Sequence, residues 1–466
     1  MRGAGTGRRS SLRRASRRLL FAFLITIALP GMALAERQPL SLERAIDLAL
    51  KNDEALRQAA QAVAGAEGQV SQARSNAFPQ FSLSGQYGRN FLRPSFFLPA
   101  EFFGEGTGSV KIRIGEDNDF TGAASVSQIL WAAGRVSAGL SAAKEYLASF
   151  RCREEATADY VRFNVKEAYY GALLAAEILR IEEKASAAAA EAARIASLGS
   201  EQGMVSRFDL LRADVELANR KAPLVKARND FNQALMVLKR RCGLEAASEI
   251  GLSDSLTAGG HPASLDSVLA AMSGGSAELK ALEHAVGAQK QYLRIAKADR
   301  YPMLRLNASY AVQTQWSNAW LPPSDLIAKS AAVQLGFQIP IFDGLNAKGK
   351  ISKAGADLRT AELELERVSR DKELAVRQSY LSLDDALAAL EGREESVALA
   401  EEAYRLAVIR LTNGLATPLE RLDAELAMTT ARAQLAEALY SSQMARAFLE
   451  LSVGSKNFEA ISGGNR

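Results

Sequence analysis

One seven-residue pattern occurs twice in the sequence. It reads Gly203-Met204-Val205-Ser206-Arg207-Phe208-Asp209 and, 211 positions later, Gly414-Leu415-Ala416-Thr417-Pro418-Leu419-Glu420. In both copies a glycine, which readily adopts a left-handed turn conformation, is followed by a serine or threonine that can cap a new helix. An acidic residue three positions after this cap completes the signature of a helix N-terminus. Each stretch therefore predicts the tip of a helical hairpin.

The similarity between the two copies extends outward from these tips. At the same spacing, the residues from Ala143 to Gly243 match those from Ala354 to Gly454, and at a spacing of 223 Ser41 matches Ser264 and Tyr87 matches Tyr310. A repeat of this length indicates a duplicated structural unit. We predict a first repeat at 36–251, a second repeat at 252–455 and a C-terminal tail at 456–466.

Within each copy the periodicity predicts a helix, a β-hairpin and a long helical hairpin. The first helices run from Ser41 and Ser264 until a proline, which cannot continue a helix. The expected β-hairpins lie at 80–130 and 303–341, and the helical hairpins lie at 134–243 and 345–453. The first arm of each helical hairpin lacks proline and is on the order of 100 Å long at 1.5 Å per residue. Helices of this length must pack lengthwise against one another.

The expected strands alternate apolar and polar residues. Phe81, Leu83 and Tyr87 alternate with serine and glutamine, and a similar alternation recurs after Pro302 and before Pro340. One apolar and one polar face suit a transmembrane β-sheet with lipid on one side and water on the other, although a small soluble sheet has the same pattern. Four strands cannot close a barrel, so two, three or four chains would supply 8, 12 or 16 strands.

The first 35 residues have the features of a secretory signal peptide. Six arginines between Arg8 and Arg18 precede an apolar run, and Ala33-Leu34-Ala35 is a small-residue cleavage signal. The run is too short to favour a membrane anchor. The chain has only Cys152 and Cys242, which could pair but are expected to be two separate thiols, so it is not a disulfide scaffold.

The sequence contains no recognisable group of catalytic or cofactor-binding residues. There are two histidines, neither with metal-ligand spacing, and no phosphate-binding glycine loop. The acidic run Glu116–Asp119 lacks a calcium-loop pattern and is interpreted as an exposed external loop. A net charge of +4 over 466 residues gives no indication of nucleic-acid binding. We expect neither an enzyme nor a metal or cofactor site.

These features together resemble the TolC-like outer-membrane efflux protein family over roughly residues 38–455. The residues that carry the resemblance are the two tip stretches, Leu40-Ser41-Leu42-Glu43-Arg44-Ala45, Phe78-Pro79-Gln80-Phe81-Ser82-Leu83 and Ile339-Pro340-Ile341-Phe342-Asp343-Gly344. The first copy departs from the last of these patterns, with Ile129, Trp131, Ala132 and Ala133 at its junction.

The resemblance implies a fold that is mostly α with transmembrane β: a trimeric 12-stranded β-barrel continued by a long α-helical periplasmic tunnel. It implies an outer-membrane exit channel of a tripartite efflux pump or a type I secretion system. The partners would be two further copies, a periplasmic adaptor (membrane fusion protein), an inner-membrane pump and outer-membrane lipid. The alternatives are a periplasmic helical adaptor or structural coiled coil, and an exported hydrolase, which the absence of a catalytic set disfavours. The transported solute, whether drug, metal or protein, is not indicated.

Two groups of candidate site residues follow from the resemblance. Acidic residues line the periplasmic aperture of such channels, and they correspond here to Asp423 and Glu420, with Asp209 at a position that ties the closed tip together. Asp209 and Glu420 are equally explained as helix-capping carboxylates, and Asp423 as a solvated surface charge. The expected adaptor-docking tips are Gly203, Met204, Val205, Gly414, Leu415 and Ala416, although turns need such small residues anyway.

Overall fold

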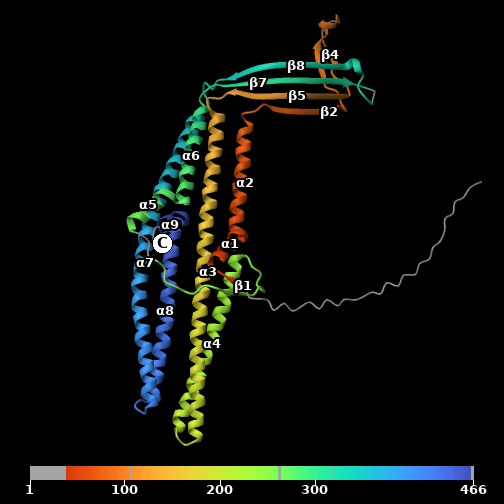
Figure 1. The fold of residues 1–466 in the computed structure, drawn as a ribbon. Coiled ribbons are helices and arrows are strands. Elements are labelled where there is room, and N and C mark those ends of the chain that lie inside the picture. The colour runs from red at the N-terminus through yellow and green to blue at the C-terminus, as the bar shows by residue number, and fades with distance from the viewer. Residues whose placement is uncertain (1–37, 105–107, 261–263, 318–319, 463–466) are drawn as a thin grey trace, which may run out of the picture.

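In the computed structural model the chain is a long helical stalk with a β-sheet at one end (Figure 1). The structure describes residues 38–104, 108–260, 264–317 and 320–462, so the predicted signal peptide lies outside the described residues. The longest helices are α3 (Arg135–Glu201) and α7 (Asn346–Thr412), of 67 residues each. They return through α4 (Arg207–Cys242) and α8 (Pro418–Val453), of 36 residues each, so both predicted helical hairpins are present.

The helices that precede the strands are each broken once, and our prediction of unbroken helices from Ser41 and Ser264 was wrong. The first is divided into α1 (Leu42–Asn52) and α2 (Glu54–Ser75), and the second into α5 (Leu265–Gly275) and α6 (Ala277–Ala298). Asp53 causes the first break, because its backbone is extended and its carboxylate accepts hydrogen bonds from the amides of Ala55 and Leu56 at 2.8 and 3.1 Å. It thereby caps a new helix. Ser276 holds the equivalent extended position in the second copy.

Four long strands form one antiparallel sheet at the end of the stalk. They are β2 (Gln80–Arg89), β5 (Asn118–Trp131), β7 (Met303–Trp316) and β8 (Ile327–Gln338), in the order β2-β5-β7-β8. The two hairpins, one from each repeat, are therefore joined through the β5–β7 pair. Within one chain the outer sides of β2 and β8 pair with no other described strand.

The register of this sheet separates apolar and polar rows, as the alternation predicted. Phe81 on β2, Val126 on β5, Ala308 on β7 and Val333 on β8 stand side by side on one face. The neighbouring row on the other face contains Ser82, Ser125, Ser309 and Ala332, and the hydroxyls of Ser82 and Ser125 are 2.6 Å apart. In the single chain the apolar face is open to solvent, with Phe81 79% exposed.

Smaller elements that were not predicted complete the fold. A short parallel pair joins β1 (Gln38–Leu40) to β6 (Ile250–Leu252). The loop between β2 and β5 contains a hairpin of β3 (Ser95–Pro99) and β4 (Ser109–Arg113) with the 3-10 turn η1 (Ala100–Phe103), and a second such turn, η2 (Ser324–Leu326), precedes β8. The expected C-terminal tail begins as helix α9 (Ser455–Ser462), whose Phe458 is buried.

Each copy has its own hydrophobic core halfway along the stalk. In the first, Val165, Tyr169 and Leu238 pack with α1, and in the second, Val376 and Leu449 pack with α5 and α9. Cys242 is buried in the first core, where burial raises the pKa of its thiol to about 11. Cys152 and Cys242 are both free thiols. Among the described residues no helix is long and apolar enough to span a bilayer.

Hydrogen bonds from Tyr169 hold the segment that connects the two copies against the first core. The Tyr169 hydroxyl lies 2.8 Å from the Leu40 carbonyl oxygen and 2.9 Å from the Asp254 carboxylate, which also accepts from the Leu42 amide. Burial and the bond to Asp254 raise the pKa of Tyr169 to about 12. Burial opposes ionisation of Asp254, but the hydrogen bonds from Leu42, Tyr169 and Ser253 outweigh it and lower the pKa of that carboxyl.

Candidate functional site at the hairpin tips

Both helical hairpins end on the side of the stalk opposite the sheet, and their turns have the same backbone geometry (Figure 1). Gly203 and Gly414 both have φ of 72°, in the left-handed region that glycine tolerates without steric cost. The amides of Met204 and Leu415 each donate to a carbonyl oxygen of the preceding helix, at 2.8 Å in both turns. The glycine at the matching position therefore reverses the chain direction with the same turn geometry in both copies.

The helices that leave the turns are capped as the sequence predicted. The Ser206 hydroxyl accepts from the amide of Asp209 at 3.1 Å, and the Thr417 hydroxyl accepts from the amide of Glu420 at 3.2 Å. Thr417 and Glu420 form a complete capping box, in which the Glu420 carboxylate also accepts from the Thr417 amide. Asp209 instead accepts a 2.6 Å hydrogen bond from the Ser206 hydroxyl. The Glu420 carboxylate thus caps a backbone amide, whereas the Asp209 carboxylate contacts only the side chain of the capping serine.

The predicted docking residues form small exposed tips. Met204 is 74% exposed and Leu415 is 70% exposed, and the two glycines beside them are also exposed. Val205 and Ala416 are half-buried against their own hairpins. Phe208, 72% exposed on the first turn of α4, was not among our candidates, although an apolar residue just after a cap is a readable signal.

The three predicted aperture acids do not lie together within one chain. Asp209 is half-buried and lines a cavity between the two hairpins, whereas Glu420 and Asp423 are exposed and do not line it. Glu420 lies 3.7 Å from the guanidinium of Arg410. Asp423 has no hydrogen bond or ion pair with any residue that the structure describes. Of the three acids, Asp423 is therefore the one that neither contacts a capping residue nor pairs with a basic residue of the described chain.

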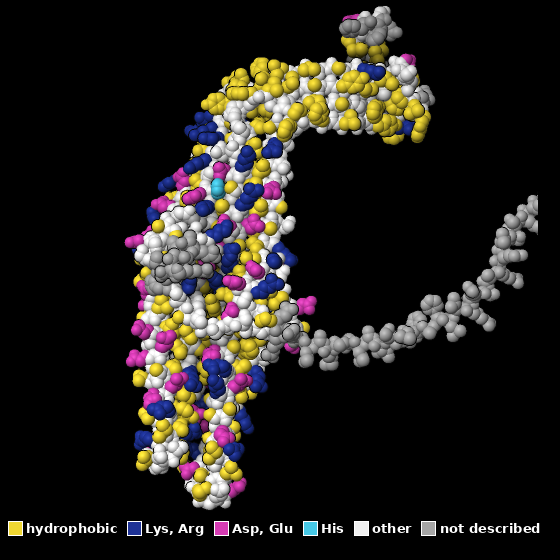
Figure 2. All heavy atoms as spheres, viewed as in Figure 1, with side chains coloured by type: hydrophobic (Ala, Val, Ile, Leu, Met, Phe, Trp, Pro, Cys, Tyr) yellow, Lys and Arg dark blue, Asp and Glu magenta, His cyan; other side chains and the backbone are white. Residues whose placement is uncertain are grey.

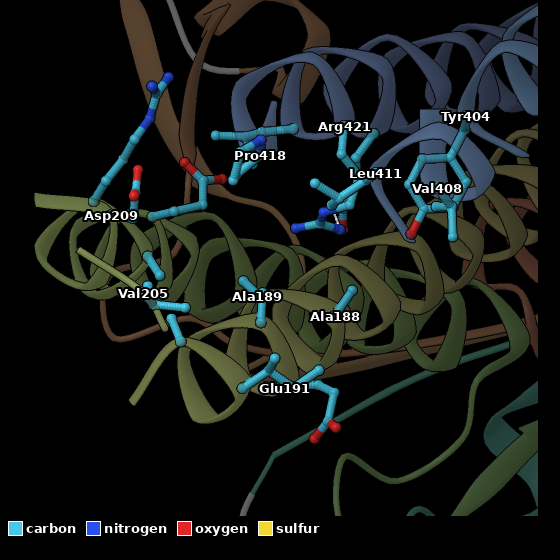
Figure 3. A pocket seen from close by; sticks show the side chains of 18 of the residues that line it. Ala188, Ala189, Glu191, Val205, Asp209, Tyr404, Val408, Leu411, Pro418 and Arg421 are labelled. Carbon is cyan, nitrogen blue, oxygen red and sulfur yellow. Dashed lines mark hydrogen bonds and ion pairs between the residues drawn. The ribbon is translucent and has the colours of Figure 1, made fainter. Parts of the chain in front are cut away.

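A cavity of about 590 Å³ separates the two hairpins just above their tips (Figure 3). The side chains of Ala189, Val205, Tyr404, Val408 and Leu411 give it a largely apolar lining, to which α3, α4, α7 and α8 all contribute. The hairpins are therefore not tightly packed on each other at this level. Relative movement of the tips needs little disruption of packed contacts here.

Two ion pairs that sequence analysis missed lie in the walls of this cavity. Arg421 is 2.7 Å from Glu425 on α8, and Arg220 is 2.7 Å from Glu216 on α4. Only 6% of the Glu425 side chain is exposed, so its charge is compensated by Arg421 in a poorly solvated place. Both pairs have i,i+4 spacing, a signal visible in the sequence, but the spacing does not reveal which helix face is covered by the other hairpin.

A metal site would need several histidine, cysteine or acidic side chains of the described chain to lie close together. Over the described ranges no three His, Cys, Asp or Glu side chains are grouped so that they could hold a metal ion. His284 is 2.8 Å from Glu145 far from the tips. The arrangement consists of two small apolar tips, a cavity between the hairpins, and the exposed acids Glu420 and Asp423 on the second tip.

A long paired stalk, a two-faced sheet with open edges and duplicated tips define the class of a channel-forming outer-membrane subunit. Residues 45–244 and 271–455, well over half of the chain, match the family model described as outer membrane efflux protein. The chain belongs to this family.

Individual proteins give the same result. The chain is 26% identical over 359 residues to protein CyaE of Bordetella pertussis, covering 76% of this chain and 71% of that protein. It is 26% identical over 320 residues to the alkaline protease secretion protein AprF of Pseudomonas aeruginosa, covering 67% and 64%. The fold matches the Campylobacter jejuni CmeC outer membrane channel with a TM-score of 0.74 at 18% identity, over 90% of this chain and 89% of that chain.

Family membership confirms the main functional prediction. The protein is located in the outer membrane and serves as an exit channel for efflux. The family is one of channel and secretion proteins. The alternative of a periplasmic adaptor or a structural coiled coil is not supported by these matches.

Proposed function

We propose that three copies of this chain close a 12-stranded β-barrel and continue it as a helical tunnel through which solutes leave the cell. The observation that carries the proposal is the two-faced sheet with two unpaired edges. Unpaired backbone groups are not tolerated in lipid, so β2 and β8 must find partners. The strand order makes β8 of one copy antiparallel to β2 of the next, so the ladder can continue around a ring.

The faces of the sheet fit this ring. The row of Phe81, Val126, Ala308 and Val333 would face lipid, and the row of Ser82, Ser125 and Ser309 would line a wet interior. Figure 2 shows hydrophobic side chains gathered on the sheet and charges of both signs along the stalk. This distribution suits a sheet in lipid and a stalk in the aqueous periplasm.

The stalk supplies the length of the tunnel. A helix of 67 residues is on the order of 100 Å long, and both hairpins run in the same direction from the sheet. Their tips therefore reach far from the outer membrane. We assign to this end the contact with a periplasmic adaptor, under an inner-membrane pump, because it presents the exposed apolar residues Met204, Leu415 and Phe208. The chain itself needs no cofactor for this passive role.

The aperture role follows from the exposed acids of the second tip. Three copies of Asp423, together with Glu420, would form an electronegative ring where the tunnel is narrowest. A ring of like charges focuses the field and favours cations. Asp209, which faces the cavity between the hairpins, is assigned to holding the tips together. The division of the chain into repeats 36–251 and 252–455 is part of this proposal.

The mass of the assembly tests ring closure. The protein would be extracted from outer membranes in a mild detergent and weighed by native mass spectrometry. Three copies, giving 12 strands, are expected. Two or four copies would give 8 or 16 strands and contradict the proposal, and a soluble monomer would contradict the barrel altogether.

A further inference from the structure

Two basic residues stand on the apolar face of the sheet at the end far from the helices. Strand alternation places Arg89 on the same face as Phe81 and Tyr87, and places Lys329 on the same face as Val333. Both side chains are exposed. A Lys or Arg on a lipid-facing position is strongly destabilising at the bilayer midplane and costs little near its surface. Their position near the strand ends is therefore that of a membrane interface.

The acidic residues of this end are already engaged by other groups. Arg93 is 2.8 Å from Asp117 and 3.5 Å from Glu116, and the Ser317 hydroxyl links the same cluster. Asp119 accepts from the Asn90 side chain. The acidic run is thus part of a network that joins the external loops of both repeats, rather than a freely solvated loop.

Arg89 and Lys329, in contrast, form no close pair with an acidic residue of the described chain: Arg89 acts on Asp117 through its charge alone, and Asp117 is already paired with Arg93. Neither forms a hydrogen bond or ion pair with a residue that the structure describes, and no such contact joins Lys329 to Asp325 in the turn η2 before β8. The Arg89 guanidinium lies 5.8 Å from the centre of the Phe91 ring. Two cations on a lipid-facing surface are therefore left for a ligand from outside the chain.

The surface beside these cations is flat and aromatic. The row that ends in Lys329 contains Gly85 on β2 and Gly122 on β5, which carry no side chain. The Phe120 ring lies over them, and a Cβ atom at Gly122 would be only 3.4 Å from it. An acyl chain or a sugar next to the charges would therefore pack against the Phe120 ring.

We propose that Lys329 of one copy and Arg89 of the next bind the phosphate groups of a phosphorylated glycolipid in the outer leaflet. The site rests on the proposed ring, because closure makes β8 of one copy the neighbour of β2 of the next and brings both cations to each subunit boundary. A trimer would have three such sites. The glycolipid would bridge adjacent subunits where the ring is joined.

Charge favours a glycolipid with phosphate monoesters over an ordinary phospholipid. A phosphate monoester carries about 1.5 to 2 negative charges at neutral pH, whereas a phosphodiester headgroup linkage carries one. Arginine can bind two phosphate oxygens at once, and lysine adds a compact point charge. Lys111 and Arg113 on β4 add further exposed cations in the external loop of the first repeat.

The test is lipid binding by the purified full-length trimer, counted by native mass spectrometry. The probes are bis-phosphorylated lipid A, the same lipid after removal of its phosphates, and phosphatidylglycerol. The variant Arg89→Gln with Lys329→Gln is compared with Lys226→Gln with Arg228→Gln, which removes the same charges from exposed positions on α4. Lys329→Arg should retain binding.

We expect up to three phosphorylated lipids on the wild type and on the α4 control. Binding to the double variant should be about 30-fold weaker, because each Lys or Arg near an anionic surface contributes about 1 kcal/mol. Equal binding by the double variant, or of the dephosphorylated lipid, overturns the site. Equal binding of phosphatidylglycerol overturns the assignment to a glycolipid. A wild type that is not trimeric overturns ring closure itself, whereas an intact trimer that binds no lipid overturns this site alone.

Discussion

The two hairpin tips have the same backbone geometry but different side chains. Their long helices have the same lengths, 67 and 36 residues, and both turning glycines have φ of 72°. Beyond the turn, the first copy has Arg212 on the wall of the cavity, and the matching residue of the second copy is the exposed Asp423. The two copies therefore share the residues that set the backbone of the turn and differ in the side chains that the tips expose. Substitutions of these two kinds of residue should have different effects.

The largest effect is expected for a charge at the second tip. Leu415→Asp should abolish export, because a carboxylate on the exposed apolar end would have to be desolvated in an adaptor contact. Export of a fluorescent pump substrate from intact cells measures this. Leu399→Asp, at a leucine on α7 that is 66% exposed away from the turn, is the matched control and should remain active. If Leu415→Asp forms trimers and exports normally, the tip is not the docking surface.

The next effect concerns the buried ion pair in the cavity wall. Arg421→Met leaves the Glu425 carboxylate, 6% exposed, without its partner, which should destabilise α8 by about 3 kcal/mol. Arg220→Met should cost less, because Glu216 is more exposed. Amide hydrogen exchange along the two hairpins would report both values. Equal protection of α4 and α8 in the two variants would contradict this ranking.

A smaller effect is expected at the turning glycines, and it should be the same in both copies. Gly203→Ala and Gly414→Ala each force a Cβ atom into the left-handed region, at a cost of roughly 1–2 kcal/mol. Because the two turns have the same geometry, thermal unfolding should shift by similar amounts. A clear difference between the two variants would show that the backbones of the tips are not equivalent in the assembly.

The smallest effect is a pH dependence of stability that only the first core should show, because Cys242 is buried in it. Burial raises the pKa of Cys242 to about 11 from an ordinary 9.0, so the fold favours its neutral thiol. This contribution to stability is fully present below pH 9 and is lost as the pH rises through 11. In a Cys152→Ser variant, which keeps Cys242 as its one thiol, alkylation should be negligible at pH 8 and increase towards pH 11, and adding Cys242→Ser should abolish it. Rapid labelling at pH 8 would mean that the first core is open.

Much of this architecture could be predicted because the signals are local. The turning glycines, the caps at Ser206 and Thr417 and the alternation of the strands fixed the hairpins and the sheet. The break at Asp53 was also local, since an aspartate can cap a helix, but helical periodicity on both sides concealed it. The break at Ser276 has no side-chain cap and gave no such signal. The β3–β4 hairpin was missed because five-residue strands give little periodicity.

The candidate site was less accessible from sequence. The tip residues could be identified from the turns, whereas the cavity could not, because it depends on how far apart two separately encoded hairpins lie. Arg421 and Glu425 have an ordinary helical spacing, and only packing makes their pair buried. The same holds for Asp209, which faces the cavity, and Asp423, which does not.

The central claim is that the second tip alone supplies the selective charge. Single-channel recording of Asp423→Ala in a planar bilayer tests it most directly, with Asp371→Ala on an exposed face of α7 as the control. We predict that cation selectivity falls clearly in Asp423→Ala and stays at the wild-type level in the control. Wild-type cation selectivity in Asp423→Ala, with trimers intact, would contradict the account.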